Sequence, residues 1–161
     1  MRNHILAIAV LLTACSDRGS RETQSGNDTS RTVSAAPTFA AALGVDLATM
    51  ARTGSGAYYR DVTVGTGTVA DSGKQVALHY RGQLPDGTQF DARQPPDEPI
   101  SFRVATGAVV RGFDEGTMGM RAGGRRLVVI PPELGYGAQG NGPVPPNAYM
   151  VFTIDLVSVR P

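Results

Sequence analysis

Residues 76–92 read VALHYRGQLPDGTQFDA, and this stretch decides what kind of sheet the chain can build. Its first half alternates apolar and polar side chains with a period of two, which is typical of a strand with one buried face. Residues 85–87, Pro-Asp-Gly, then favour a turn, because proline fixes φ and glycine tolerates a positive φ. After the turn the chain runs back and ends in an aromatic residue beside a carboxylate. We therefore expect Tyr80, Phe90 and Asp91 to reach one concave site from two adjoining strands.

The C-terminal part of the chain carries further strand patterns, separated by segments rich in glycine and proline. The 20 Gly and 11 Pro residues of the chain favour turns and short strands over long helices. Only residues 109–120 show a short amphipathic helical pattern, and residues 135–147 form a loop rich in Gly and Pro. The strand patterns occupy residues 58–64, 100–104, 125–130 and 149–159. Together they predict an α+β fold, in which an antiparallel sheet curls around a single short helix.

The N-terminus has the features of an export signal. A basic start, MRNH, precedes an apolar run at residues 5–12 that is too short to span a bilayer. Residues 12–15, Leu-Thr-Ala-Cys, resemble the lipobox of bacterial lipoproteins, where cleavage before the cysteine precedes its acylation. We expect residues 1–14 to be a signal peptide and Cys15 to be a lipid anchor, with an ordinary secretory signal as the alternative. Ser16 after the cysteine resembles lipoproteins sorted to an outer membrane, which predicts a location there, facing the periplasm.

Two segments separate the signal from the strand-rich region. Residues 15–37 are polar and rich in Ser, Thr, Gly, Asn and Arg, so we expect a flexible, disordered tether. Residues 38–56 place apolar side chains near helical spacing, with Thr38 as a candidate N-cap. Because Gly44 weakens a helix, this short helical segment is expected to form one interrupted helix or two short turns. We predict a lid on the edge of the sheet, with a dimerisation element as the alternative, and a folded domain over residues 57–161.

Charge, cysteine and histidine content exclude several classes of function. A net charge of +1 gives no reason to expect a nucleic-acid partner. The single cysteine rules out an intrachain disulfide and any cysteine-based metal site. With only two histidines, one of them in the signal region, Ser-His-Asp catalysis and histidine metal sites have no support. No metal and no cofactor are expected.

Three stretches together resemble one enzyme family. They are residues 76–92, residues 109–140 (VVRGFDEGTMGMRAGGRRLVVIPPELGYGAQG) and residues 144–159 (VPPNAYMVFTIDLVSV). In this order they resemble the FKBP-type peptidyl-prolyl cis-trans isomerases, the macrolide-immunophilin family, over residues 58–160. The resemblance implies five or six antiparallel strands wrapped on the helix that carries Phe113, with an apolar pocket between them. It also implies rotation of X–Pro bonds in unfolded or exported proteins, without a cofactor.

The resemblance assigns roles to individual residues. Tyr80, Phe90, Asp91 and Tyr136 form the implied catalytic set. The Tyr136 hydroxyl and the Val110 backbone N–H are expected to donate to substrate carbonyls, and Asp91 to lie at the rim as an acceptor or electrostatic tuner. The implied substrate-binding residues are Tyr80, Phe90, Asp91, Ile100, Val109, Val110, Phe113, Tyr136, Val144 and Phe152.

Departures from the family pattern shape the expected pocket. Phe113 stands where the family usually has tryptophan, which implies weak macrolide binding. Ile100 stands where an aromatic residue is frequent, so that wall is expected to be lower, while Val144 and its loop close one side. Asn141 replaces a histidine often present in this loop, and Pro143 stiffens the loop. A small, exposed pocket with limited substrate selectivity is the expected result.

Several alternatives stay open from the residues alone. Phe152 could be purely a core residue, and Asp91 could cap a turn or pair with Arg93 or Arg111. The arginine pair at residues 125–126 is expected to be the solvated start of a strand. For the protein as a whole, the alternatives to an isomerase are a non-catalytic chaperone that uses the same groove and a surface lipoprotein that adheres to a host component.

Overall fold

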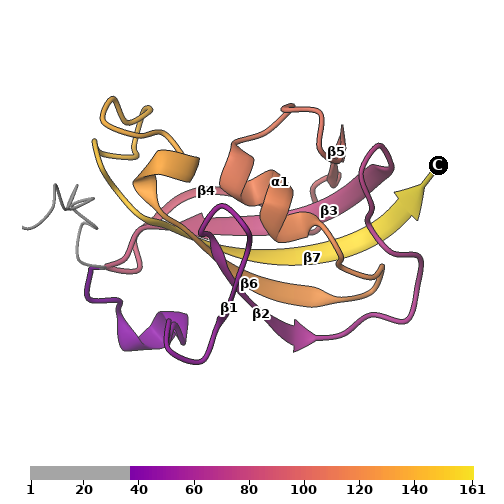
Figure 1. Cartoon of the computed structure of the whole chain (residues 1–161), viewed down its shortest axis with the longest axis horizontal. Helices are drawn as coiled ribbons and strands as arrows, with labels where there is room; N and C mark the ends of the chain where they lie inside the picture. Colours follow the sequence, from indigo (N-terminus) through magenta and orange to yellow (C-terminus); the bar gives the residue numbers. More distant parts are fainter. Residues whose placement is uncertain (1–36) are drawn as a thin grey trace, which may run out of the picture. The chain divides into compact units, whose positions relative to one another are not determined.

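Alternating buried and exposed side chains build one antiparallel sheet in the computed structural model, which describes residues 37–161 (Figure 1). The strands lie in the order β1-β2-β6-β7-β3-β4, and β5 pairs with the part of β3 that β4 leaves free. The strands are β1 (Ala51–Arg52), β2 (Tyr58–Thr63), β3 (Gln75–Gln83), β4 (Gln89–Arg93), β5 (Ile100–Arg103), β6 (Arg125–Ile130) and β7 (Met150–Arg160). One α-helix, α1 (Arg111–Thr117), and two 3₁₀ turns, η1 (Ala41–Leu43) and η2 (Pro132–Leu134), complete the described elements.

The predicted α+β class is confirmed, with a larger sheet than expected. The sheet has 7 strands instead of five or six, because the 2-residue β1 pairs with β2 at one edge. The longest pairing joins β3 to β7 from Gln75 to Gln83, with one shift of register between Ala77 and Leu78. This long central pair carries several of the residues predicted to form the pocket.

The turn predicted at residues 85–87 joins β3 to β4. The Leu84 N–H donates to the Thr88 carbonyl at 2.8 Å, and the Gly87 N–H donates to the Leu84 carbonyl at 2.9 Å. Gly87 has a φ of 92°, a conformation that glycine adopts without strain. The Asp86 carboxylate accepts the Thr88 N–H at 2.8 Å, and this bond lowers the pKa of Asp86 below its usual range. The turn therefore returns the chain as the sequence predicts.

The main hydrophobic core lies on the face of the sheet that meets α1. Alternate side chains of β3, β6 and β7 point to this face, and Phe113 of α1 packs against them. Figure 1 shows α1 lying across this face. The buried aliphatic residues that these three strands contribute include Val76, Leu78, Val128, Ile130, Ile154 and Leu156.

Two residues without side chains let α1 approach β6 closely. A Cβ added at Gly112 would lie 2.4 Å from Cγ2 of Ile130, and one at Gly116 would lie 2.6 Å from Cγ1 of Val128. Real non-bonded carbon atoms prefer separations of about 3.5–4.0 Å. Because residues four apart lie on the same face of a helix, both glycines meet the sheet together. The position of Phe113 therefore depends on this close contact.

The N-terminal segment differs from the predicted helix. Only η1 forms, its first turn has no side-chain cap, and Thr38 is not its N-cap, because Ala40 precedes η1. Gly44 ends η1 in the left-handed conformation, with φ of 61°. A second turn follows at Asp46, whose carbonyl accepts the Thr49 N–H at 3.1 Å. Of the two expectations, two short turns are therefore correct and one interrupted helix is wrong.

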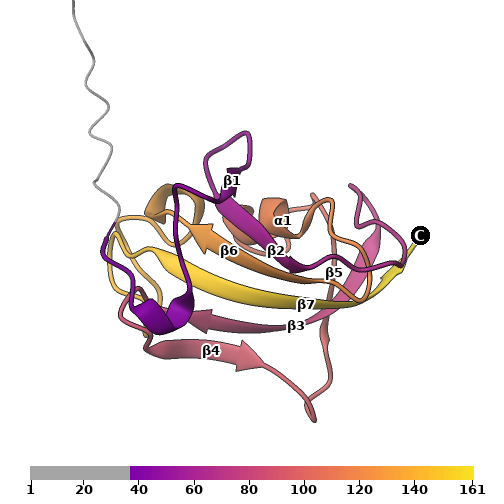
Figure 2. The same ribbon diagram turned by 90° about the horizontal axis from the view of Figure 1, so that it is seen from below.

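This segment covers the face of the sheet opposite α1 instead of its edge. Figure 2 shows this segment crossing in front of the sheet, with α1 behind the sheet. The segment's apolar side chains pack on outward-facing residues of β6 and β7 and form a second, smaller core. A lid on the sheet edge is thus a wrong prediction, because period-two alternation leaves an apolar strip on this second face as well. The residues that meet here are Phe39, Leu43, Val45, Leu47 and Met50 from the segment, with Leu127, Val129 and Val151 from the sheet.

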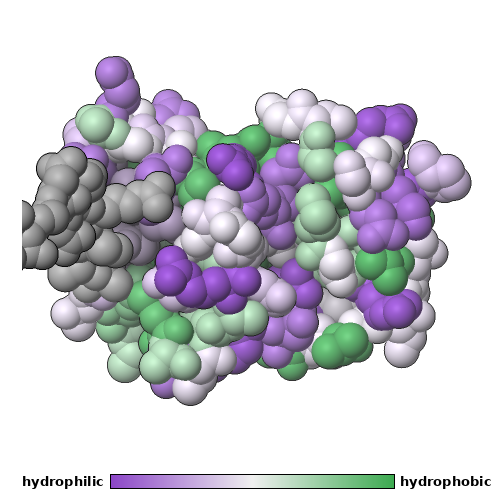
Figure 3. All heavy atoms as spheres, in the orientation of Figure 1, coloured by the Kyte–Doolittle hydropathy of each residue, from purple (hydrophilic) through white to green (hydrophobic). Residues whose placement is uncertain are grey.

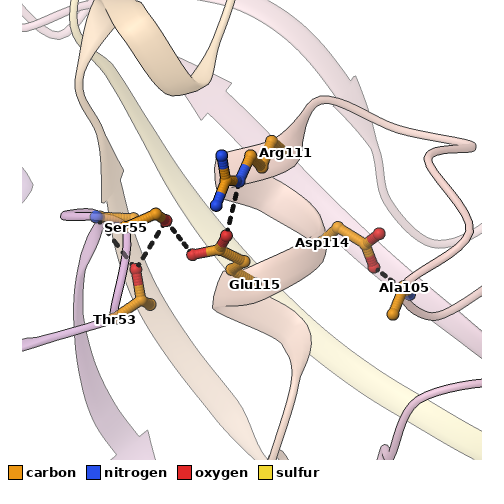
Figure 4. A network of polar contacts seen from close by, with 7 residues as sticks. Thr53, Ser55, Ala105, Arg111, Asp114 and Glu115 are labelled. Atoms are coloured by element: carbon orange, nitrogen blue, oxygen red, sulfur yellow. Dashed lines mark hydrogen bonds and ion pairs between the residues drawn. The ribbon is translucent and has the colours of Figure 1, made fainter.

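A polar contact ties the end of the N-terminal segment to α1. The Ser55 hydroxyl donates to the Glu115 carboxylate, which also accepts the Arg111 Nε–H at 2.8 Å (Figure 4). The Thr53 hydroxyl lies 3.4 Å from the Ser55 hydroxyl and accepts the Ala57 N–H at 3.1 Å. The segment therefore contacts the protein at both faces of the sheet.

The arginine pair at the start of β6 splits into one exposed and one buried residue. Arg125 is half exposed and pairs with Asp155 at 2.6 Å. Arg126 is only 5% exposed and donates to Asp61 at 2.7 and 3.1 Å. The prediction of a solvated strand start is therefore wrong for Arg126, because its position in β6 turns it toward α1 and away from solvent.

The predicted signal peptide, the lipidation site Cys15 and the predicted tether up to residue 36 lie outside the described residues. Within residues 37–161, no helix is long and apolar enough to cross a membrane.

Candidate functional site

A hollow of about 330 Å³ opens on the α1 face of the sheet, between β3, β7, α1 and the loops beside them. Hydrophobic atoms show at the upper centre of Figure 3, between the loops that flank α1, with polar atoms around them. Eight of the ten predicted pocket residues line the hollow: Tyr80, Asp91, Ile100, Val109, Val110, Phe113, Tyr136 and Phe152. Ala108 lines it as well and was not predicted, because one small loop residue gives no pattern of its own.

Aromatic rings at edge-to-face angles form the inner wall of the hollow. The Phe113 ring lies 5.0 Å from the Phe152 ring at 79° and 5.7 Å from the Tyr80 ring at 77°, measured between centroids. Phe102 supports Phe113 from the buried side at 6.0 Å. Such geometry places the positive edge of one ring against the negative face of another, which fixes the rings relative to one another. The hollow therefore has a rigid apolar floor made by Phe113.

Phe90 and Val144 do not line the hollow, in contrast to the prediction. The Phe90 ring packs on the Phe152 ring at 5.6 Å and 88°, and Gly82 leaves room for both rings. Val144 is 4% exposed and belongs to the core, and its backbone closes the loop through two 2.9 Å hydrogen bonds with Asn141. Both residues therefore support the pocket walls from behind.

Tyr80 and Asp91 come together from β3 and β4, as the sequence predicts. The Tyr80 hydroxyl donates to the Asp91 carboxylate at 2.6 Å, in the range of a strong charge-assisted bond. Burial of the hydroxyl, and then this hydrogen bond, raise the pKa of Tyr80 well above its ordinary value. Among the described residues no ion pair joins Asp91 to Arg93 or Arg111, and Arg111 pairs with Glu115 instead. The Asp91 carboxylate therefore lies at the rim of the hollow, where its hydrogen bond with the Tyr80 hydroxyl holds it in place.

The raised pKa of Tyr80 predicts a loss of stability at alkaline pH. The folded chain keeps a proton that the unfolded chain releases above pH 10.0, so stability is fully present below that pH and declines as the pH rises beyond it. Urea unfolding between pH 8 and pH 11 should show a larger fall in midpoint for the wild type than for Tyr80→Phe. Equal falls in the two proteins would contradict a Tyr80 hydroxyl held neutral by its surroundings.

Two further polar groups face the hollow beside Phe113. Tyr136 follows η2, lines the hollow and is half buried. The Val110 carbonyl accepts the N–H groups of Phe113 and Asp114 at 3.0 and 3.1 Å and so begins α1. Within the described residues, no hydrogen bond uses the N–H of Val110, which stays available to a ligand. The site thus combines an apolar floor with one hydroxyl, one backbone donor and the Tyr80–Asp91 pair.

These groups suit a small apolar ring flanked by carbonyl groups. The ring would rest on Phe113, and the carbonyl oxygens would meet the donors at the rim. Within residues 37–161, no three His, Cys, Asp or Glu side chains come together as a metal site.

Comparison with known proteins agrees with this geometry. A family model described as FKBP-type peptidyl-prolyl cis-trans isomerase matches residues 67–157. An FK506-binding protein of Neisseria meningitidis serogroup B is 40% identical over 105 residues, which cover 65% of this chain and 96% of the relative. The peptidyl-prolyl cis-trans isomerase FKBP2 of Mus musculus is 43% identical over 89 residues, which cover 55% of this chain and 64% of the relative.

A solved structure gives the same result for the fold. The crystal structure of FkpA from Escherichia coli is 37% identical and superposes with a TM-score of 0.64, covering 70% of this chain and 52% of that one. The residues that the family model matches include all of α1 and every residue that lines the hollow. The chain belongs to the family of FKBP-type peptidyl-prolyl cis-trans isomerases, and its function is the isomerisation of peptide bonds that precede proline.

Proposed function

We propose that the hollow beside α1 binds proline on Phe113 and accelerates rotation of the preceding peptide bond in exported proteins. The observation that carries this proposal is the Tyr80–Asp91 hydrogen bond at the rim of an apolar hollow whose floor is Phe113. The hollow, at about 330 Å³, is large enough for a proline ring.

The reaction requires little covalent chemistry from the protein. An X–Pro bond has partial double-bond character and a rotation barrier of roughly 18–20 kcal/mol. At the top of the barrier the amide is twisted, its carbonyl is less polar and its nitrogen is pyramidal. An apolar site favours this state over the more dipolar planar amide, and fixed donors can hold the carbonyls in the twisted geometry. A thousandfold acceleration needs only about 4 kcal/mol of such preference.

The polar groups divide this work between them. The Tyr136 hydroxyl and the Val110 N–H donate to the carbonyls on the two sides of the rotating bond. The Asp91 carboxylate, oriented by Tyr80, lies at the rim, where it acts on the electrostatics of the amide. Phe90 acts through Phe152, whose ring it holds in place. Macrolides would bind the same hollow weakly, because the Phe113 ring is smaller than the indole usual in the family.

Removal of the polar groups tests this assignment. We expect Tyr136→Phe and Asp91→Ala each to lower kcat/KM for an X–Pro tetrapeptide by about tenfold, since one oriented hydrogen bond contributes about 1–1.5 kcal/mol. Cis–trans exchange measured by NMR with the full chain in mild detergent gives the rates, and circular dichroism verifies folding. Tyr58→Phe and Asp97→Ala remove the same groups outside the hollow and should leave the rates unchanged.

Two other results would change the conclusion. A well-folded wild-type chain that gives no acceleration would overturn the catalytic proposal and favour a binding module that uses the same groove. Rates that fall equally in the site variants and in the control variants would show that Tyr136 and Asp91 have no special role.

The chain is further proposed to act at a bacterial membrane. Cleavage before Cys15 and acylation of that residue would hold the domain at an outer membrane, facing the periplasm, and residues 16–37 would serve as its tether. Support comes from the lipobox-like residues 12–15 and from Ser16. Detergent-phase partition of the chain expressed in a Gram-negative host should place the wild type in the detergent phase and Cys15→Ser in the aqueous phase. A wild-type chain that stays in the aqueous phase would remove the anchor and leave a secreted enzyme.

A further inference from the structure

A second hollow lies beside the first, between α1 and the loop that precedes it. It has a volume of about 400 Å³. The residues that line it come from the loop, from α1 and from the position after α1: Ala105, Gly107, Val109, Arg111, Asp114, Glu115 and Met118. Figure 4 shows the Asp114 carboxylate reaching toward the loop on one side of α1, while Glu115 points to the other side. Apart from Val109, no residue that lines the first hollow lines this one.

The polar groups around the second hollow are engaged within the protein. The Asp114 carboxylate accepts the Ala105 N–H at 2.8 Å, and Asp114 is 6% exposed. The Glu115 carboxylate accepts bonds from both Ser55 and Arg111. Because these acceptors already have donors, the hollow has little to attract a cation. The Arg111 side chain also lines it and is 69% exposed, with its Nε–H engaged by Glu115, and the other lining groups are apolar or small.

Met118 is the largest apolar side chain that lines the second hollow. It is 39% exposed, and it is one of four large hydrophobic residues exposed in the described chain. A thioether side chain is flexible and adapts to ligands of different shape, which suits a surface that meets many sequences. The hollow therefore fits an apolar side chain of variable outline.

The loop wall of the second hollow is held in shape before any ligand arrives. Ala105 has a φ of 61°, and the Asp114 carboxylate fixes its N–H. The Thr106 hydroxyl donates to the Arg103 carbonyl at 2.7 Å, which ties the same loop back to β5. A preformed wall lowers the cost of binding, because less of the protein must become ordered.

Val109 lines both hollows, so they are neighbours on the protein surface. A polypeptide with proline on Phe113 would pass over Val109 on its way into the second hollow. Because the two hollows share a lining residue and an extended chain advances about 3.3 Å per residue, a spacing of about two to four residues is the range to test. One substrate can therefore occupy both.

We propose that the second hollow is a subsite for an apolar side chain, such as leucine, that lies about two to four residues from the isomerised proline in the same polypeptide. The subsite rests on the proposed function of the first hollow and gives it a substrate class. Clients would be unfolded segments in which proline has an apolar neighbour at this distance. Peptides that are too short to reach beyond Val109 would lack this contribution.

The test compares long and short substrates on the full-length chain in mild detergent. Ten-residue peptides with one central proline carry leucine or serine at one position, moved two, three or four residues to either side of the proline. A proline tetrapeptide is the short reference. NMR exchange gives kcat/KM for each, and we expect leucine to exceed serine by about three- to tenfold at one position, from the partial burial of one side chain. Met118→Gln should reduce this ratio to about one, and Met118→Leu should retain it.

Val62→Gln is the matched control, because Val62 is 55% exposed on β2 and lines neither hollow. The control should leave the leucine-to-serine ratio unchanged. No leucine advantage at any position, or an advantage that survives Met118→Gln, would overturn the subsite. If the wild-type chain accelerates the tetrapeptide, such a result leaves the proposed function intact. If the tetrapeptide is not accelerated either, the proposed function fails and the subsite fails with it.

Discussion

Arg126→Met should lower the free energy of unfolding by about 2–4 kcal/mol, because carbonyl groups at the end of α1 lose their donor and each buried acceptor left unpaired costs about 1–3 kcal/mol. The Arg126 guanidinium donates to Asp61 and, at 3.0 Å each, to the carbonyls of Gly116 and Met118 at the end of α1. It also lies 4.5 Å from the centre of the Tyr59 ring. Methionine fills much of the volume but leaves these acceptors without a donor, and buried acceptors without donors are costly. Urea unfolding followed by circular dichroism measures the loss.

Arg125→Met is the control next to it in the chain. Arg125 also holds a carboxylate with two bonds, to Asp155 at 2.6 and 3.1 Å, but its side chain is 54% exposed. Surface pairs of this kind contribute about 0–1 kcal/mol, so the expected loss is below 1 kcal/mol. The same substitution at adjacent positions thus separates the contribution of burial to the free energy of unfolding from the contribution of charge. Similar losses in the two variants would contradict the central role of the buried guanidinium.

Gly112→Ala should reduce both stability and activity, against the usual preference of helices for alanine. Helix propensity alone would favour alanine by about 1 kcal/mol. The added methyl group would lie 2.4 Å from Cγ2 of Ile130, which is fully buried in β6 and has no room to move away. Overpacking of this kind costs about 1–3 kcal/mol. Because Phe113 follows directly, a shift of α1 displaces the pocket floor, and we expect kcat/KM for an X–Pro tetrapeptide to fall at least about tenfold.

Gly54→Ala provides the comparison for this variant. A Cβ at Gly54 would meet no atom within 4 Å, so its unfolding free energy should stay within about 0.5 kcal/mol of the wild type and its activity should not change. Both variants are measured by urea unfolding and by NMR exchange. A Gly112→Ala chain with unchanged activity would mean that α1 can move away from β6 without disturbing Phe113.

Short-range patterns predict most of the fold and of the pocket. The turn at residues 85–87 and the alternation in β3 bring Tyr80 and Asp91 together, because period-two geometry decides which side chains share a face. The family resemblance then identified Tyr136 and Phe113, which lie far from this hairpin in the sequence. Eight of the ten predicted pocket residues line the hollow for these two reasons.

The remaining differences arise from tertiary contacts that no local pattern contains. Arg126 occupies an inward-facing position of β6. No local pattern in the sequence indicates that carbonyl groups at the end of α1 accept hydrogen bonds from it. Phe90 and Val144 pack behind the pocket, because room left by Gly82 and closure of the loop by Asn141 decide their place. The glycines at 112 and 116 did carry a local signal, four residues apart on one helix face, for a close contact with a sheet.

The packing of residues 39–50 on the sheet changes where a usable domain begins. The family match starts at residue 67, and the strand pattern alone suggested residue 57. A protein cut at either point would lose the side chains that cover Leu127, Val129 and Val151 on the open face of the sheet. These three residues would then form an adhesive apolar strip across two neighbouring strands, of the kind that promotes aggregation. The shortest protein suitable for expression therefore begins before Phe39. Residues 39–50, which lie outside the family match, keep the domain soluble because they cover this apolar strip.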